Sequence, residues 1–271
     1  MAKLQKKLWN LFGDSLGKTL FHPQFFLKSY EYQAVLELKK RAKGIMIDIG
    51  CGRQIYKKEL VGQVKKYIGV DHPQVSKKYE DKEKPDVFAD ALDLPFSTNY
   101  CDTVSMISVL EHIPDPTRAI QEASRILKPN GIFVLITVQN YPLHDAPYDY
   151  FRYTRFSLKK LMENEGLKIV SLKPLGTYPI FAGQLFNVFL LNTIKKALSQ
   201  NTFTLIVALL LTPFIFLLTT LSNFTSLFLS KLIPEDYTKG AFAIYNLAVA
   251  KKLPKSKTTS LTSKYNLAKS H

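Results

Sequence analysis

Three carboxylates and a pair of glycines have the spacing expected of a small-ligand site. The segment DIGCG, from Asp48 to Gly52, places small residues where a strand would turn into a helix. Glycines there let the backbone approach a ligand closely, and N–H groups at a helix start point at it. Asp71 and Asp90 each end a further strand-like run. A dinucleotide fingerprint needs a glycine at the position of Ile55, so the segment argues against a nicotinamide or flavin enzyme.

Two histidines are candidate general bases. His112 follows a strand-like run, and His144 lies in a loop, residues 141–154, that is rich in aromatic and ionisable groups. A positioned base that removes a proton from an acceptor hydroxyl adds about 10²- to 10⁴-fold to the rate. The alternative for His112 is a helix cap or a supporting role, and both readings stay open for His144. Arg152 and Tyr153 would either hold an anionic or sugar-like acceptor or fix the loop to the core.

The elements that would position these residues alternate between strands and helices. The predicted strands cover residues 45–49, 67–71, 86–90, 102–107, 132–138, 167–172 and 241–252. Helices are predicted over 4–12, 28–42, 116–127 and 157–166, and a turn at Pro129-Asn130-Gly131. Strands separated by helix-length segments predict a mostly parallel sheet with helices on both faces.

With these elements in place, residues 44–173 resemble the class I S-adenosylmethionine-dependent methyltransferases. The motifs that carry the resemblance are DIGCG, the acidic ends of the second and third strands, VLEHIPDP at 109–116 and RILKPNG at 125–131. Single motifs are loose, but their order and spacing are specific. The resemblance implies an α/β Rossmann-like sheet with an antiparallel last strand, S-adenosyl-L-methionine as cofactor, and relatives among the ubiquinone/menaquinone-methyltransferase-like enzymes.

The resemblance also implies roles for individual residues. Asp48 would face the methionine amino group, directly or through water, and Asp71 would accept from both ribose hydroxyls. Asp90 would accept from the adenine amino group. Gln54 replaces a third glycine that the family often has, yet the loop should form because the first two glycines make the closest approach. The expected cofactor-binding residues are Asp48, Gly50, Cys51, Gly52, Asp71, Asp90, Ala91 and Ser108.

An apolar segment interrupts the alternation before the last strand. No charged residue lies between Lys196 and Lys231, and the run 203–221 is long enough for one bilayer crossing. Because the last strand must return to the sheet, we expect a re-entrant or interfacial helical hairpin, bent at Pro213 or at Ser222-Asn223. A buried helical subdomain or a dimer interface is the alternative. Lysines near the apolar pieces favour an anionic leaflet, which predicts attachment to the cytoplasmic side of the cell membrane.

Composition and the order of segments further restrict the partners, bound groups and domain organisation that we expect. The formal net charge is +15, which points to an anionic partner or to a solvated lysine-rich surface. Two cysteines, Cys51 and Cys101, without a CxxC pair or a His/Cys cluster, predict neither disulfides nor a metal site. The expected organisation is amphipathic helices at 1–43, the cofactor domain at 44–180, the apolar insertion at 181–236, the last strand at 237–252 and a basic, disordered tail at 253–271.

These features predict an enzyme that methylates oxygen or carbon of a lipophilic, lipid-linked or glycan-type acceptor at the membrane. Methyltransferases of nucleobase amino groups commonly carry a D/N-P-P-Y motif where this chain has Ser108-Val109-Leu110-Glu111, which argues against nucleic acid as the substrate. An RNA methyltransferase with a basic surface is one alternative. A protein that binds the cofactor without turnover is another.

Overall fold

The structure is a computed structural model that describes residues 18–74, 84–200, 202–233 and 240–254. The chain divides into two compact units. The sheet unit contains the described residues of 33–139, 143–174 and 245–254. The hairpin unit contains those of 18–32, 140–142 and 175–244. The helix predicted over 4–12, most of the basic tail and residues 234–239 lie outside the described residues.

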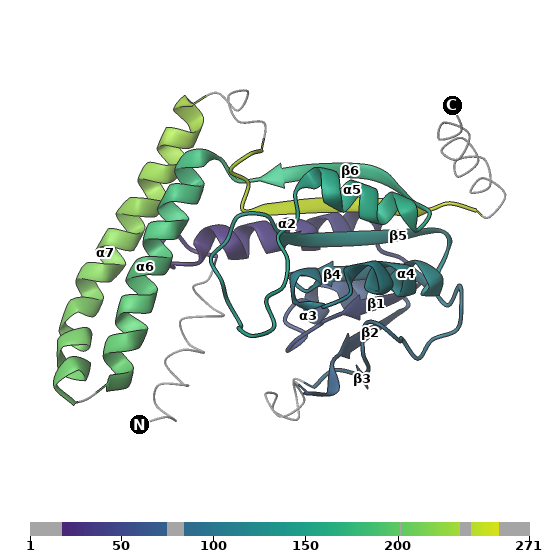
Figure 1. Cartoon of the computed structure of the whole chain (residues 1–271), viewed down its shortest axis with the longest axis horizontal. Coiled ribbons are helices and arrows are strands. Elements are labelled where there is room, and N and C mark those ends of the chain that lie inside the picture. The colour runs from purple at the N-terminus through teal and green to yellow at the C-terminus, as the bar shows by residue number, and fades with distance from the viewer. Residues whose placement is uncertain (1–17, 75–83, 201, 234–239, 255–271) are drawn as a thin grey trace, which may run out of the picture. The chain divides into compact units, whose positions relative to one another are not determined.

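A seven-stranded sheet forms the sheet unit's centre, with strand order β3-β2-β1-β4-β5-β7-β6 (Figure 1). Strands β1 to β5 pair in parallel, and β7 pairs antiparallel with β5. This confirms the predicted Rossmann-like class with its reversed last strand. The strands are β1 Ile45–Ile49, β2 Lys66–Asp71, β3 Val87–Phe88, β4 Cys101–Ile107, β5 Leu127–Val138, β6 Leu167–Leu175 and β7 Tyr245–Lys252.

Helices connect the strands and begin at residues that cap them. The Asp115 side chain accepts from the N–H of Arg118 at the start of α4, and Thr154 accepts from Ser157 at the start of α5. The helices are α2 Phe25–Arg41, α3 Lys57–Leu60, α4 Pro116–Ile126, α5 Arg155–Asn164, α6 Tyr178–Gln200 and α7 Thr202–Leu232, with short 3₁₀ helices η1 Val61–Gln63 and η4 Leu110–His112.

A continuous apolar core lies between the sheet and its helices. Its fully buried members include Ile47, Val104 and Phe133 from neighbouring strands and Ile120 from α4. These residues occupy the β-branched runs and the amphipathic helix that the sequence predicts. Burial of this surface holds the strand ends in fixed positions, and the candidate site is built on those ends.

Two predicted elements differ in the structure. Strand β3 is limited to Val87–Phe88, so Asp90 follows it in a loop. The predicted turn at residues 129–131 lies inside β5 as an irregularity: the register passes from Cys101↔Leu127 to Thr103↔Ile132, and Asn130 has φ 65°. The chain does turn there, but β4 pairs with β5 both before and after the turn, so the strand continues through it.

The apolar segment forms a helical hairpin in which α6 and α7 pack along each other (Figure 1). The predicted bends at Pro213 and Ser222-Asn223 were wrong, because α7 runs unbroken through both, and the two helices of the hairpin are instead separated between Gln200 and Thr202. Proline removes a single backbone donor, and a helix packed along a neighbour tolerates that loss.

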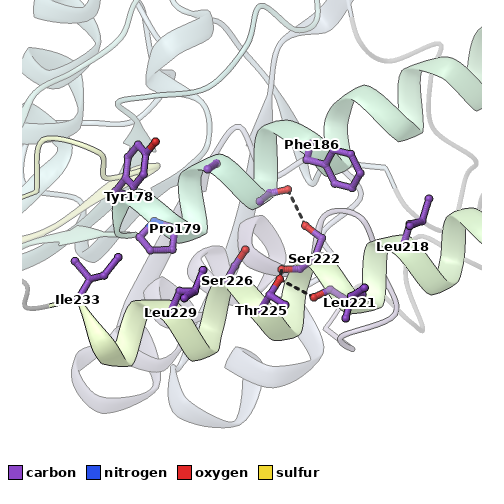
Figure 2. A pocket seen from close by; sticks show the side chains of 12 residues that line it. Tyr178, Pro179, Phe186, Leu218, Leu221, Ser222, Thr225, Ser226, Leu229 and Ile233 are labelled. Carbon is purple, nitrogen blue, oxygen red and sulfur yellow. Dashed lines mark hydrogen bonds between the residues drawn. The ribbon is translucent and has the colours of Figure 1, made fainter.

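Polar side chains at the supposed bend hold the hairpin together. The buried Asn187 donates to Asn223 Oδ1 at 2.8 Å, and Asn223 Nδ2 donates to the carbonyl of Leu20 at 2.8 Å. At Gly183 the helices approach so closely that a methyl group would lie 2.0 Å from Ser226 Oγ. Figure 2 shows Ser222 directed toward α6 across the apolar groove between the two helices. Small and polar residues are typical of helix contacts in apolar surroundings.

Most of the α7 surface is apolar and exposed. Among the described residues, one helical segment, Leu210–Leu232, is long and apolar enough to cross a membrane by length and composition. Only 17% of its most apolar window is buried. Leu210, Phe214 and Leu217 are each more than 60% exposed, so in this chain α7 is not the buried core helix of a subdomain.

Candidate active site

The loop after β1 turns on two glycines with left-handed backbone. Gly50 has φ 70° and Gly52 has φ 55°, a region that residues with side chains rarely adopt. The N–H groups of Gly50 and of the buried Cys51 both donate to Val70 O in β2. A methyl group on Gly50 would lie 2.3 Å from Val109, whereas one on Gly52 would meet no atom within 4 Å. Packing therefore requires glycine at 50, and Gly52 faces space that a ligand can fill.

Gln54 stands where the resemblance leads one to expect a third glycine, and the loop forms without it. Its φ is 53°, so it adopts the conformation that glycine would supply. Left-handed backbone costs a residue with a side chain about 1–2 kcal/mol. The Gln54 amide donates to the carbonyl of Lys84, which offsets part of that cost.

Asp48, in β1, lies beneath the glycine loop and is 5% exposed. Tyr67 Oη donates to its Oδ2, and Ser105 Oγ donates to its Oδ1, both at 2.5 Å. Burial raises the pKa of Asp48, and the two hydrogen bonds oppose that rise. Asp48 thus ties β1 to β2 and β4. Sequence patterns did not single out Tyr67 or Ser105, because both look like ordinary strand residues.

Asp71, at the end of β2, contacts the glycine loop directly. Its Oδ2 accepts from the N–H of Gly52 at 3.0 Å, and its Oδ1 accepts from the N–H of His72 at 2.7 Å. A carboxylate oxygen has two lone pairs, so each oxygen of Asp71 can accept from more than one donor. The structure thus brings Asp71 and Gly52 together, and their role toward the cofactor stays a prediction.

The other predicted cofactor residues lie at the carboxyl ends of β3 and β4. The exposed Asp90 lies 3.7 Å from His72 Nε2, and Ala91 beside it is half-buried. Ser108, with φ 55°, donates from its hydroxyl to Tyr245 Oη at 3.2 Å. Because β1 to β4 are parallel and adjacent, their carboxyl ends meet at one edge of the sheet, where open α/β sheets bind ligands.

The loop after β5 brings His144 against His112. The two rings meet edge to face, with centroids 4.9 Å apart. His144 Nδ1 lies 3.1 Å from Asp149 Oδ2, which also accepts from the backbone N–H of His144 at 2.9 Å. His112 Nδ1 lies 2.7 Å from the carbonyl oxygen of Tyr148. Both imidazoles are therefore held in place through Nδ1.

Arg152 fixes this loop through Asp149, the partner of His144. It binds both carboxylate oxygens of Asp149 at 2.6 Å, and the hydrogen bond from Arg152 lowers the pKa of Asp149 to about 2. The buried Tyr153 donates to the carbonyl of Leu110 at 3.4 Å. Of the two roles left open by the sequence, the structure shows loop fixing for both. Asp149 was missed, although its position five residues after His144 in the same loop was a usable signal.

Glu111, in η4, lies close to both His112 and His144 and forms a cluster with them. It is fully buried, and Thr137 Oγ1 donates to its Oε2 at 2.6 Å. One ligand atom each of Glu111, His112 and His144 lies within 4.8 Å of the other two. The sequence search for metal-ligand motifs found no such group, because these residues come from two loops more than thirty positions apart.

Comparison with known proteins agrees with this architecture. A family model described as a methyltransferase domain matches residues 28–172, which is more than half of the chain. The chain belongs to the methyltransferase domain family. It is an S-adenosylmethionine-dependent methyltransferase, as its sheet and glycine loop also indicate.

This methyltransferase is 24% identical to a ubiquinone biosynthesis O-methyltransferase from Coxiella burnetii, over 66% of this chain and 84% of that protein. It is 38% identical to a tRNA (carboxymethyluridine(34)-5-O)-methyltransferase from Arabidopsis thaliana, over 35% of this chain and 24% of that one. A solved structure of a putative sarcosine dimethylglycine methyltransferase from Galdieria sulphuraria superposes with a TM-score of 0.53 at 15% identity, covering 83% and 85% of the two chains. That superposition shows the fold.

Proposed function

We propose that this methyltransferase methylates a hydroxyl oxygen of a lipophilic small molecule or lipid-linked acceptor at the membrane surface. The observation that carries the proposal is the pairing of His144 with Asp149, in the loop after β5 and two strands along the sheet from β1 and its glycine loop. A carboxylate that accepts from Nδ1 leaves Nε2 as the nitrogen that acts on an acceptor. Such a pair serves an oxygen acceptor, whose proton must be removed.

The residues at the carboxyl ends of β1 to β4 fit the cofactor. The space above Gly52 admits a ligand against backbone N–H groups, and Asp71 beside it offers carboxylate oxygens for the ribose hydroxyls. We assign adenine recognition to Asp90 with Ala91, and the methionine end to Asp48, acting through water because it is buried. S-adenosylmethionine supplies, when bound, a methyl group activated on its sulfonium sulfur.

The chain's own part in the reaction is positioning and proton removal. His144 Nε2 would take the proton of the acceptor hydroxyl as that oxygen receives the methyl group. Asp149 then stabilises the charged imidazole, and Arg152 holds Asp149 ionised. His112, with Nδ1 on the Tyr148 carbonyl, packs on the His144 ring and fixes its orientation. Alignment of donor and acceptor contributes about 7–11 kcal/mol of the rate enhancement.

Two observations support a lipophilic acceptor. The relative from Coxiella burnetii carries a name that places it in ubiquinone biosynthesis, and α7 exposes an apolar surface too large for an ordinary monomer in water.

The two ends of the hairpin meet, since Ile244 N donates to Leu175 O at 2.8 Å. Both ends therefore lie on the same side of any membrane that the hairpin enters.

The lysines constrain how the hairpin meets the membrane. Lys196 is exposed near the end of α6, and Lys231 is exposed near the end of α7, at the opposite end of the hairpin. A tip that stopped in the hydrocarbon would bury Lys196 at a cost of about 2.5–3.5 kcal/mol. We therefore propose monotopic attachment to the cytoplasmic leaflet, with the hairpin lying in the interface and both lysines at the headgroups.

RNA is the second candidate substrate. It is favoured by the tRNA methyltransferase relative and by the net charge of +15. Against it, the matched stretch is 101 residues long, and no aromatic-basic nucleic-acid module is visible in the sequence.

Labelled S-adenosylmethionine tests the proposal. The full chain in mild detergent is incubated with a membrane lipid extract in one arm and with total tRNA in the other. We expect label in the organic-soluble product of the first arm, released by ether cleavage, and at least about tenfold less of it after His144→Ala. Label confined to RNA would select the second candidate, and label in neither arm would contradict an acceptor present in these extracts.

A further inference from the structure

The cluster of Glu111, His112 and His144 has the composition of a metal site. Two imidazoles and one carboxylate form the protein ligand set of catalytic zinc centres and of non-haem iron(II) centres. One ligand atom each lies within 4.8 Å of the other two. Tetrahedral ligand atoms about 2.0–2.2 Å from one ion lie about 3.3–3.6 Å apart, so the three side chains would rotate toward one another to bind the ion.

Each of the three side chains already makes a contact, through a second polar atom, of the kind that orients metal ligands. His144 Nδ1 contacts the carboxylate of Asp149, and His112 Nδ1 contacts the carbonyl oxygen of Tyr148. Glu111 accepts at Oε2 from Thr137 Oγ1. Metal-binding histidines donate their other ring N–H to a carboxylate or carbonyl, which fixes the tautomer and directs Nε2 at the ion. A single His–Asp pair would explain His144 alone, whereas the metal site explains all three arrangements.

Charge at the cluster also suits a cation. The fully buried Glu111 carboxylate lies beside the rings of His112 and His144, and the Asp149 carboxylate is matched by Arg152. With neutral histidines, the sum over Glu111, Asp149 and Arg152 is one negative charge. A buried carboxylate that gains a directly bound cation loses much of the cost of its desolvation.

We propose that Glu111, His112 and His144 bind one divalent transition-metal ion, Zn²⁺ or Fe²⁺ in class. Protein ligands at three positions leave at least one coordination position for an exogenous oxygen. This inference rests on the proposed function in one respect: the acceptor hydroxyl would occupy that position. Coordination would lower the pKa of a bound hydroxyl, so the ion would activate the acceptor oxygen, whose proton would pass to solvent water and not to His144 Nε2.

Calorimetric titration of the full chain tests the site. The protein, purified in detergent on a tag without histidines and stripped with a chelator, is titrated with ZnCl₂. We expect one saturable Zn²⁺ site per chain, weakened at least about 100-fold by His112→Ala and equally by His144→Ala. Asp149→Asn should weaken it about 10- to 100-fold, the effect of losing an outer partner of a ligand. His72→Ala, outside the cluster, is the control and should leave binding unchanged.

Binding of Co²⁺ gives a second readout that does not depend on activity. Visible absorption bands of a nitrogen- and oxygen-bound ion should appear in the parent chain and disappear in both histidine variants. Glu111→Gln is a weaker test because Glu111 is fully buried, so the two histidine variants, checked for folding by circular dichroism, decide. Absence of a saturable site, or a site that both variants retain, overturns the inference. If Zn²⁺ does not bind while His144→Ala abolishes methylation, the metal site fails and the proposed function stands.

Discussion

At the scale of single residues, the site depends on two glycines, one required by packing and one that leaves space for a ligand. Gly50 packs against Val109, whereas Gly52 faces open space with its N–H on Asp71. Both have positive φ, so alanine at either position carries backbone strain of about 1–2 kcal/mol. Alanine at 50 adds a clash, which costs about 1–3 kcal/mol more.

We therefore expect Gly50→Ala to lower the melting temperature more than Gly52→Ala does. Gly52→Ala should instead weaken S-adenosylhomocysteine binding, because its methyl group occupies the ligand's space. Thermal unfolding and calorimetric titration of the same two samples separate the effects. Unchanged affinity in a folded Gly52→Ala variant would show that Gly52 does not face the cofactor.

Asp71→Ala should weaken S-adenosylhomocysteine binding by about 1.5–3 kcal/mol, the range for hydrogen bonds to a charged group. The loss combines the ribose contacts with the bond to Gly52 that steadies the loop. Glu163→Ala, which removes an exposed carboxylate on α5, is the matched control. Unchanged affinity in a folded Asp71 variant would remove this residue from the site.

His144→Ala should lower turnover at least about tenfold while cofactor affinity stays nearly intact, since His144 acts on the acceptor. The comparison is steady-state turnover against S-adenosylhomocysteine binding. Tyr148→Phe is the control, because the carbonyl that contacts His112 is retained and only an exposed phenol is changed. Full turnover of the His144 variant would show that another group activates the acceptor.

At the scale of elements, the α6–α7 hairpin is held by buried amides in an apolar surface. Asn223 joins α7 to Asn187 of α6 and to the carbonyls of Leu20 and His22. Removing it leaves buried polar groups without their donor or acceptor, which costs about 1–3 kcal/mol. The same residue therefore fixes both the helix pair and the segment before α2.

Asn223→Ala should accordingly destabilise the hairpin far more than Thr225→Ala, whose exposed hydroxyl bonds only to carbonyls of its own helix. Thermal unfolding in detergent, followed by circular dichroism, compares the two variants. Adding Asn187→Ala to Asn223→Ala should cost less than the sum of the single losses, because the pair shares one bond. Full additivity would contradict a direct contact between them.

At the scale of the whole molecule, the hairpin is an insertion between β6 and β7 whose ends meet at Leu175 and Ile244. Replacing residues 178–232 by a short flexible linker is therefore sterically feasible, and shortening such an insertion costs little in loop entropy. The cofactor strands belong to the sheet unit and should still bind S-adenosylhomocysteine in the shortened chain.

The full chain should need detergent to leave membranes, while the shortened chain should be soluble. High salt should not release the full chain, because salt screens lysine charges but not apolar burial. Fractionation of lysed cells with salt and with detergent measures this directly. Recovery of the full chain as a soluble monomer would contradict membrane attachment. A soluble dimer would assign the apolar face of α7 to a second copy.

The sequence by itself determined the sheet and the edge of the sheet on which the expected cofactor residues lie, because both are encoded locally. Strand periodicity placed β1, β2, β4 and β7, and parallel order then required Asp48, Asp71 and Asp90 to share an edge. It could not decide where the apolar segment reverses, since Pro213 and Asn223 resemble bends when read alone and only packing between α6 and α7 keeps them helical. The tertiary structure alone decided the His144–Asp149 pair and the meeting of Glu111, His112 and His144. These contacts join loops that follow different strands, and their distance in space depends on how the strands pair and not on their spacing along the chain.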